Sequence, residues 1–209
     1  VERLGAEATI LDVDGEGRFD LDALDAAITD RTVLVALMHA NNEIGVINDV
    51  AAIGAICRER GVLFHVDAAQ SGGKVPLDMA VLPIDMLSLS AHKIYGPKGI
   101  GVLYVRRDPP VPLEAQIHGG GHERGMRSGT LNVPGIAGLG KACALCAEEL
   151  ENGHTKELQK LRDKLYKNIT DSLDFVELNG DLENGLPGTL NVSFAYVEGE
   201  ALMMGMNCL

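Results

Sequence analysis

The stretch TVLVALM at residues 32–38 is an almost unbroken apolar run with the length of a β-strand. Asp49 then begins a segment whose apolar residues recur at helical spacing, and this segment ends near Gly61. A second apolar run, residues 62–66, follows directly. Because strand, helix and strand in this order favour a parallel sheet with right-handed crossovers, the pattern predicts an α/β fold.

Further elements are predicted on both sides of this unit. Upstream, we expect a short strand at residues 8–13 and an amphipathic helix that Asp20 caps. Downstream, residues 85–90 and 101–105 supply two more strands for the same sheet. Residues 106–129 are rich in Pro and Gly, which indicates a long ordered loop of the kind that often carries function.

The last third of the chain has a different pattern. Helix resumes after Asn132, and from Cys143 to about Leu173 we expect one long charged helix that bridges two domains. Strands are expected at 175–178 and 189–194, and a final helix from Glu198 to Leu209. We therefore expect residues 1–150 to form part of a large domain, and residues 151–209 to form a linker helix and the beginning of a smaller α+β domain. Since the chain lacks an initial Met and its last helix has no cap, we expect a fragment.

Composition narrows the range of functions. The 209 residues include 18 Lys and Arg against 30 Asp and Glu, a formal net charge of −12, which argues against nucleic acid as a partner. No apolar run approaches the roughly 20 residues that a membrane-spanning helix needs. The four cysteines are too few and too irregularly spaced for a disulfide framework, which predicts a reducing, cytoplasmic location; they are Cys57, Cys143, Cys146 and Cys208.

Polar clusters follow three of the predicted strands, at residues 39–43, 67–70 and 90–93. Ligands of open α/β sheets bind beyond the carboxyl ends of the strands, so such clusters are candidate sites. Loops are often polar, and one cluster alone would indicate little. Three clusters together predict a ligand site at this edge of the sheet.

The third cluster places Lys93 beside Ser90 and His92. A lysine amine can form an imine with an aldehyde, while a hydroxyl and an imidazole can hold a phosphate. Asp67, at the end of a buried strand, can pair with a pyridinium nitrogen, and the amides of Asn42 and Gln70 can donate hydrogen bonds to a ring oxygen. Ordinary roles remain open: a solvated surface lysine for Lys93, a helix N-cap for Asp67, and loop hydrogen bonding for the two amides.

Four ordered motifs extend this pattern, at residues 39–45, 64–70, 90–99 and 119–130. With these motifs the chain resembles the cysteine desulfurases of the NifS/IscS type, which belong to the class V aminotransferase group of fold-type I pyridoxal-phosphate enzymes. The resemblance covers essentially every residue. It implies a PLP-transferase-like, three-layer α/β/α large domain with a mostly parallel sheet.

The resemblance also assigns the site residues. Lys93 matches the lysine that carries the cofactor, and Asp67 matches the partner of the pyridine nitrogen. Asn42 and Gln70 match residues that contact the cofactor, and Ser90 and His92 match ligands of its phosphate. Thr130 matches a residue that reaches the phosphate of the cofactor in the neighbouring subunit. A two-fold dimer is therefore implied.

The implied activity removes sulfur from L-cysteine, leaving L-alanine and a persulfide on an enzyme cysteine. Sulfur-acceptor and iron-sulfur scaffold proteins would be the partners, in cluster assembly and thio-modification. The sulfur-accepting cysteine is expected beyond Leu209, and Cys208 is not assigned that role. Upstream phosphate-binding and ring-stacking residues are expected before Val1, so the chain alone would be inactive. A selenocysteine lyase or another class V enzyme is an alternative, and a non-catalytic assembly scaffold is a second.

Three further patterns in the sequence are weaker. The P-loop-like run Gly135–Lys141 lacks both a hydroxyl residue after the lysine and a preceding strand. Cys143 and Cys146 have CxxC spacing but no second pair. His118 and His122 could bind metal with a neighbouring glutamate, but a role in ordering the loop or a subunit interface is favoured. We therefore expect no metal site.

Overall fold

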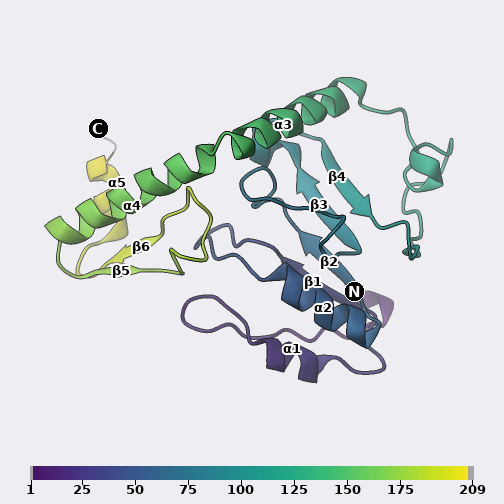
Figure 1. Cartoon of the computed structure of the whole chain (residues 1–209), viewed down its shortest axis with the longest axis horizontal. Coiled ribbons are helices and arrows are strands. Elements are labelled where there is room, and N and C mark those ends of the chain that lie inside the picture. The colour runs from purple at the N-terminus through teal and green to yellow at the C-terminus, as the bar shows by residue number, and fades with distance from the viewer. Residues whose placement is uncertain (1, 207–209) are drawn as a thin grey trace.

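A computed structural model describes residues 2–206, and its centre is a four-stranded sheet with strand order β1-β2-β3-β4 (Figure 1). The first three strands are parallel and the fourth is antiparallel to the third. Their bounds are Leu34–Met38, Leu63–Asp67, Met86–Ser90 and Gly101–Val105. This mixed sheet confirms the α/β prediction and the positions of four predicted strands.

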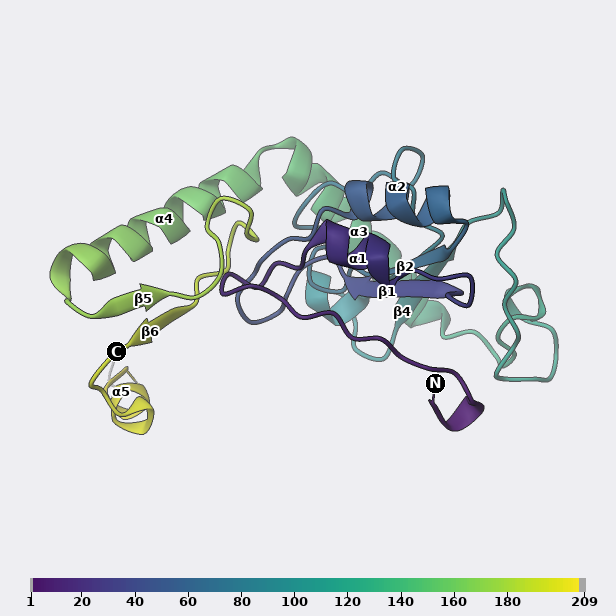
Figure 2. The ribbon, with the colours of Figure 1, turned by 90° about the horizontal axis from the view of Figure 1, so that it is seen from below.

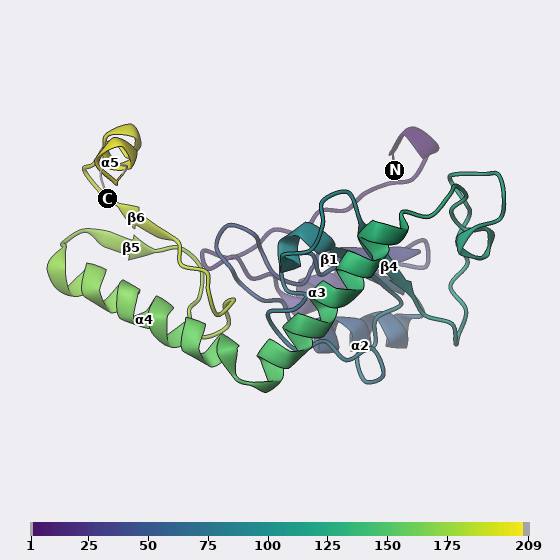
Figure 3. The ribbon, with the colours of Figure 1, turned by 90° about the horizontal axis from the view of Figure 1, so that it is seen from above.

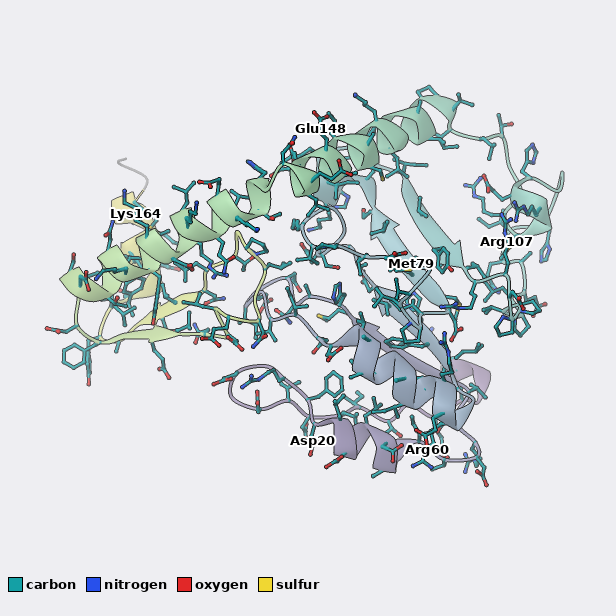
Figure 4. All side chains as sticks on the ribbon, in the orientation of Figure 1. Asp20, Arg60, Met79, Arg107, Glu148 and Lys164 are labelled. Carbon is teal, nitrogen blue, oxygen red and sulfur yellow. The ribbon has the colours of Figure 1, made fainter. Side chains whose placement is uncertain are left out.

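Two helices pack on one face of the sheet, α1 (Leu21–Ala27) and α2 (Val50–Arg60). Each begins where an aspartate side chain accepts backbone hydrogen bonds, as predicted; the aspartates are Asp20 and Asp49. Gly61 ends α2 with a φ of 69°, a left-handed conformation that glycine adopts without strain. Arg60, which Figure 4 labels at the end of α2, forms an ion pair with Asp25 of α1, with Nε 2.7 Å from Oδ1.

Alternation along the strands separates the two faces of the sheet. Phe64 and Val66 are fully buried in the cluster that also contains apolar side chains of α1 and α2. The opposite face keeps Leu34, Met38 and Leu103 between 43% and 50% exposed. The second helical layer of the expected three-layer arrangement is therefore incomplete among the described residues.

Residues 8–13 do not form the predicted strand. They run as extended chain along the sheet (Figure 2) and have no pairing partner among the described residues. Ile10 and Val13 are 88% and 59% exposed. The local apolar pattern suited a strand, but a strand also needs a neighbouring edge to pair with.

The long helix predicted from Cys143 to Leu173 is two helices, α3 (Val133–Glu151) and α4 (His154–Ser172). Figure 3 shows the bend between them. Gly153, with a φ of 74°, interrupts the helical backbone. The helix expected after Asn132 begins there, and Asn132 caps it through a hydrogen bond that its Oδ1 accepts from Gly135 N.

The second lobe contains α4, a two-stranded antiparallel sheet and α5. The strands β5 (Val176–Leu178) and β6 (Val192–Phe194) are shorter than predicted, and α5 spans Gly199–Met206. Cys208 lies outside the described residues. The one buried side chain of α4 is that of Arg162, which donates hydrogen bonds to the carbonyl oxygens of Leu182 and Leu186. These bonds fasten α4 to the loop before β6.

Candidate active site

The carboxyl ends of β1, β2 and β3 meet at one edge of the sheet, as the sequence predicted. The register pairs Met38 with Asp67 and Asp67 with Ser88. Backbone hydrogen bonds continue past the strands, from His39 N to Asp67 O at 2.8 Å and from Ala68 N to Ser88 O at 2.9 Å. Asp67 therefore lies between the ends of two neighbouring strands.

Asp67 has one occupied and one available carboxylate oxygen. Its Oδ1 accepts a hydrogen bond from Ala69 N at 2.9 Å, which fixes the turn after β2. Its Oδ2 has no hydrogen-bond partner within residues 2–206, and the side chain is exposed. The turn-capping role is thus present, and an acceptor remains free for a ligand.

Ser90 and His92 form a hydrogen-bonded pair, with Ser90 Oγ 2.8 Å from His92 Nδ1. The pair lies where β3 passes into the 3₁₀ turn η2 (Ala91–Ile94). The second ring nitrogen of the exposed His92 has no hydrogen-bond partner among the described residues. In either tautomer of His92 the pair keeps one free donor, the Nε2–H group of the histidine or the hydroxyl of Ser90, and this donor can bind an anion such as phosphate.

Lys93 follows in η2, and its side chain is exposed. Within the described residues its ammonium group has neither a hydrogen bond nor an ion pair. Helix α3 packs against this turn so closely that a Cβ atom on Gly138 would lie 2.4 Å from Pro97 Cγ. The backbone that carries Lys93 is therefore held between β3 and α3.

The loop that carries Asn42 is held by the second lobe. Gly45 O accepts a hydrogen bond from Leu186 N at 2.8 Å, and Glu43 O accepts one from Asn191 Nδ2 at 3.2 Å. Gly45 has a φ of 77° and approaches Thr189 so closely that a side chain there would collide with it. Asn42 itself is exposed, and its amide makes no hydrogen bond with the described residues.

Gln70 is half-buried in the turn after β2, and its amide likewise makes no hydrogen bond within residues 2–206. The ordinary loop role considered for Asn42 and Gln70 is therefore not seen. Thr130 is exposed and lies just before the cap of α3, more than 35 residues along the chain from Lys93. No described contact brings Thr130 to Ser90 or His92 of the same chain.

Sequence reasoning missed Lys74. A cavity of about 290 Å³ beside the sheet edge is lined by both Lys74 and Lys93, while none of the other predicted site residues lines it. Lys74 follows Ser71 and two glycines after the second polar cluster, and this Gly-Gly-Lys sequence was the signal that could have identified it.

His39, at the start of the first cluster, is 6% exposed, and its Nδ1 has no partner among the described atoms. Burial lowers the pKa of its imidazole. The side chain is therefore neutral near pH 7, and it is a core residue rather than an exposed ligand of the site.

The weaker patterns prove to be structural. Gly135–Lys141 lies inside α3 with no strand before it. His122 Nδ1 accepts a hydrogen bond from Gly129 N at 3.3 Å, which is a loop-ordering role. In the part of the chain that the structure describes, no group of three His, Cys, Asp or Glu side chains could hold a metal ion, and no helix is long and apolar enough to span a membrane.

Comparisons with known proteins agree with this arrangement. The chain is 56% identical over all its 209 residues to the cysteine desulfurase IscS of Salmonella arizonae and equally to that of Escherichia coli O139:H28. Among solved structures, a NifS-like protein matches 99% of the chain with a TM-score of 0.91 and 39% identity. DndA of Streptomyces lividans matches 99% of it with a TM-score of 0.88, also at 39% identity.

The chain spans about half the length of these relatives, 51% of the two IscS proteins and 56% and 58% of the two structures. The aminotransferase class-V family model matches residues 1–207, nearly the whole chain. Because this match covers nearly every residue, the chain belongs to the aminotransferase class-V family.

Proposed function

We propose that this protein is a pyridoxal-phosphate enzyme that removes sulfur from L-cysteine, producing L-alanine and an enzyme persulfide. The observation that carries the proposal is the meeting of Lys93, the Ser90–His92 pair and Asp67 at one edge of the sheet. The IscS relatives, which are named cysteine desulfurases, support the choice of L-cysteine as the substrate.

The side chains at this edge suit the functional groups of pyridoxal phosphate. Ser90 and His92 would hold the phosphate, and the free oxygen of Asp67 would pair with the protonated pyridine nitrogen. The unengaged amides of Asn42 and Gln70 would donate to the ring oxygen. Thr130 would reach the phosphate in the neighbouring subunit, which accounts for its exposed position away from the other residues. The enzyme would therefore be a homodimer.

When bound, the cofactor supplies the electron sink for carbanion chemistry. Lys93 would hold the cofactor through its Nζ atom, at the aldehyde group. The same Nζ atom would accept the α-proton of the substrate and return a proton to the product. Asp67 would hold the proton on the ring nitrogen throughout.

Two of the three described thiols do not suit the role of sulfur acceptor, because they are buried. Burial, with a smaller effect of Asp85, raises the pKa of the Cys57 thiol to about 11. Burial also raises the pKa of Cys146, with lesser contributions from Glu149 and Cys143. The third thiol, Cys143, is exposed and lies inside α3. We place the accepting cysteine outside the described residues, as the resemblance to cysteine desulfurases implies. Its sulfur would pass to acceptor and iron-sulfur scaffold proteins in the cytoplasm.

Turnover of L-cysteine by the protein at its native length tests this proposal. Asp67→Asn should lower alanine formation by about 100-fold or more, a typical effect of removing one active-site electrostatic partner. The control is Asp78→Asn, because Asp78 caps a turn in the same manner, by accepting a hydrogen bond from Ala80 N at 2.8 Å. Its rate should stay within about twofold of the parent.

Unchanged turnover in Asp67→Asn, or absence of alanine formation in the parent protein, would overturn the proposal. The second outcome would favour the scaffold alternative, provided that the dimer still forms. Faster turnover of L-selenocysteine than of L-cysteine would favour the selenocysteine lyase alternative.

A further inference from the structure

A hydrogen-bonded pair of side chains lies on the sheet beside Asp67. His65 belongs to β2 and Ser88 to β3, and His65 Nε2 is 2.8 Å from Ser88 Oγ. Both side chains are partly buried. Because successive residues of a strand point to opposite faces, His65 and Asp67 share one face, the face of the sheet that α1 and α2 leave uncovered.

The ring of His65 reaches along the strands toward the carboxyl edge of the sheet. In the parallel register of β2 and β3, His65 lies beside Met86, whereas Asp67 lies beside Ser88. His65 therefore makes its hydrogen bond two residues beyond its own neighbour, to the side chain that stands next to Asp67. The pair thus lies directly behind the carboxylate of the proposed site.

Ser88 and Asp67 are fixed side by side on adjacent strands. Ala68 N donates a hydrogen bond to Ser88 O at 2.9 Å, which holds the two backbones together at this step. Adjacent strands lie about 5 Å apart, so paired residues on one face have side chains within reach of each other. The Oδ2 of Asp67 has no hydrogen-bond partner within residues 2–206. A free acceptor therefore lies next to the pair.

In either neutral tautomer of His65, the pair has one hydrogen-bond donor to spare. If Nε2 carries the proton, it donates to Ser88 Oγ, and the hydroxyl of Ser88 is free to donate. If Nδ1 carries the proton, the hydroxyl donates to Nε2, and the N–H group at Nδ1 is free. Nδ1 makes no hydrogen bond with the described residues. The pair therefore offers a donor beside a carboxylate oxygen that lacks one.

We propose that His65 and Ser88 are positioning residues for the reaction proposed above, because their spare donor holds the free oxygen of Asp67 toward the cofactor. The backbone hydrogen bond to Oδ1 fixes one oxygen, and a second donor at Oδ2 would fix the other. A carboxylate oxygen can accept two hydrogen bonds, so Oδ2 would still pair with the ring nitrogen. This inference rests on the proposed function of Asp67.

Binding of pyridoxal phosphate to the native-length protein, freed of cofactor, tests the proposal. Ser88→Ala removes the hydroxyl and the partner that orients His65, so the dissociation constant should rise about threefold to tenfold, the effect of one hydrogen bond. His65→Phe should change it in the same direction. Ser88→Thr keeps the hydroxyl and should retain the parental constant within about twofold.

A cofactor analogue with carbon in place of the ring nitrogen separates positioning of Asp67 from a general effect on the fold. Because the analogue cannot pair with Asp67, Ser88→Ala should change its dissociation constant by less than about twofold. In an Asp67→Ala background, Ser88→Ala should likewise have no further effect on the binding of pyridoxal phosphate.

Ser193→Ala is the matched control, because Ser193 accepts a hydrogen bond of the same length, 2.8 Å, from Asn179 Nδ2 in the second lobe. It should leave cofactor binding unchanged. The proposal is wrong if Ser88→Ala binds pyridoxal phosphate as the parent does, if it weakens the analogue equally, or if its effect persists without Asp67. Failure of the parent itself to bind the cofactor would overturn the proposed function and this inference together, so the two failures are distinguishable.

Discussion

Two side chains at the sheet edge each make one hydrogen bond within the chain and leave a second polar atom free. Asp67 holds the turn after β2 with one oxygen and exposes the other. His92 is oriented through Nδ1 by Ser90 and keeps its second nitrogen available. The hydrogen bonds that orient these side chains would thereby also position the proposed ligand site. The sequence alone could identify these side chains as candidate site residues, because each is polar and each follows the end of a predicted strand.

At this scale we predict that His39 makes the fold sensitive to acid. Its pKa is lowered by burial from an ordinary value of 6.5, so below pH 6.5 the unfolded chain binds the proton more tightly. The free energy of unfolding contributed by His39 should be fully present above that pH and fall as the pH is lowered. Urea denaturation at pH 7.5 and 5.5 should show a smaller loss for His39→Phe than for the parent.

His154→Phe is the control, since His154 is exposed on α4. It should leave the difference between the two pH values unchanged. An equal loss of stability in His39→Phe and in the parent would contradict the assignment.

Elements form where local signals and packing agree. The caps at Asp20, Asp49 and Asn132 were predictable, because each carries its own hydrogen bonds to the next turn. The prediction of a strand at residues 8–13 was wrong. A strand forms only where it can pair with the edge of a sheet, and the local sequence pattern does not show whether such an edge lies nearby. The bend at Gly153 was missed, because flanking residues on both sides have helical composition.

Close approach of α2 to the loop before β3 supplies an element-scale prediction. A Cβ atom on Gly54 would lie 2.6 Å from Pro83 O, a backbone atom that cannot rotate away. Gly54→Ala should therefore lower the free energy of unfolding by about 1–3 kcal/mol, the usual cost of overpacking. In α3, Gly140 has open space around it, and Gly140→Ala should instead stabilise by about 1 kcal/mol through helix propensity.

Chemical denaturation of Gly54→Ala, Gly140→Ala and the parent protein measures the two changes in the free energy of unfolding. If Gly54→Ala were stabilising, the loop that carries Pro83 would have to move at little cost in free energy. That result would contradict the prediction that close packing of α2 against this loop contributes to stability.

At the scale of the whole molecule, the chain forms two lobes (Figure 1), and residues of both contribute to the proposed site. The first supplies Asp67, Ser90, His92 and Lys93, and the second clamps the loop that carries Asn42. Family and fold were predictable, because the motifs stand in order along the chain. The cavity shared by Lys74 and Lys93 was not, because it joins four segments that are distant in sequence.

Unequal burial of the lobes predicts unequal local stability. Phe64 and Val66 of β2 lie fully buried in the main core, whereas none of the eight residues of α5 is buried. Amide hydrogen exchange should therefore be slowed at least about 100-fold more in β2 than in α5. Similar protection of both elements would show that the second lobe is as stable as the first.

The most direct test of the account is where the cofactor attaches. The native-length protein with pyridoxal phosphate bound is reduced with borohydride, digested and analysed by mass spectrometry. The account predicts a single pyridoxyl modification on the peptide that contains Lys93 and none in Lys93→Ala. A modification on Lys74 or Lys98, or a reduced adduct that persists in Lys93→Ala, would contradict it.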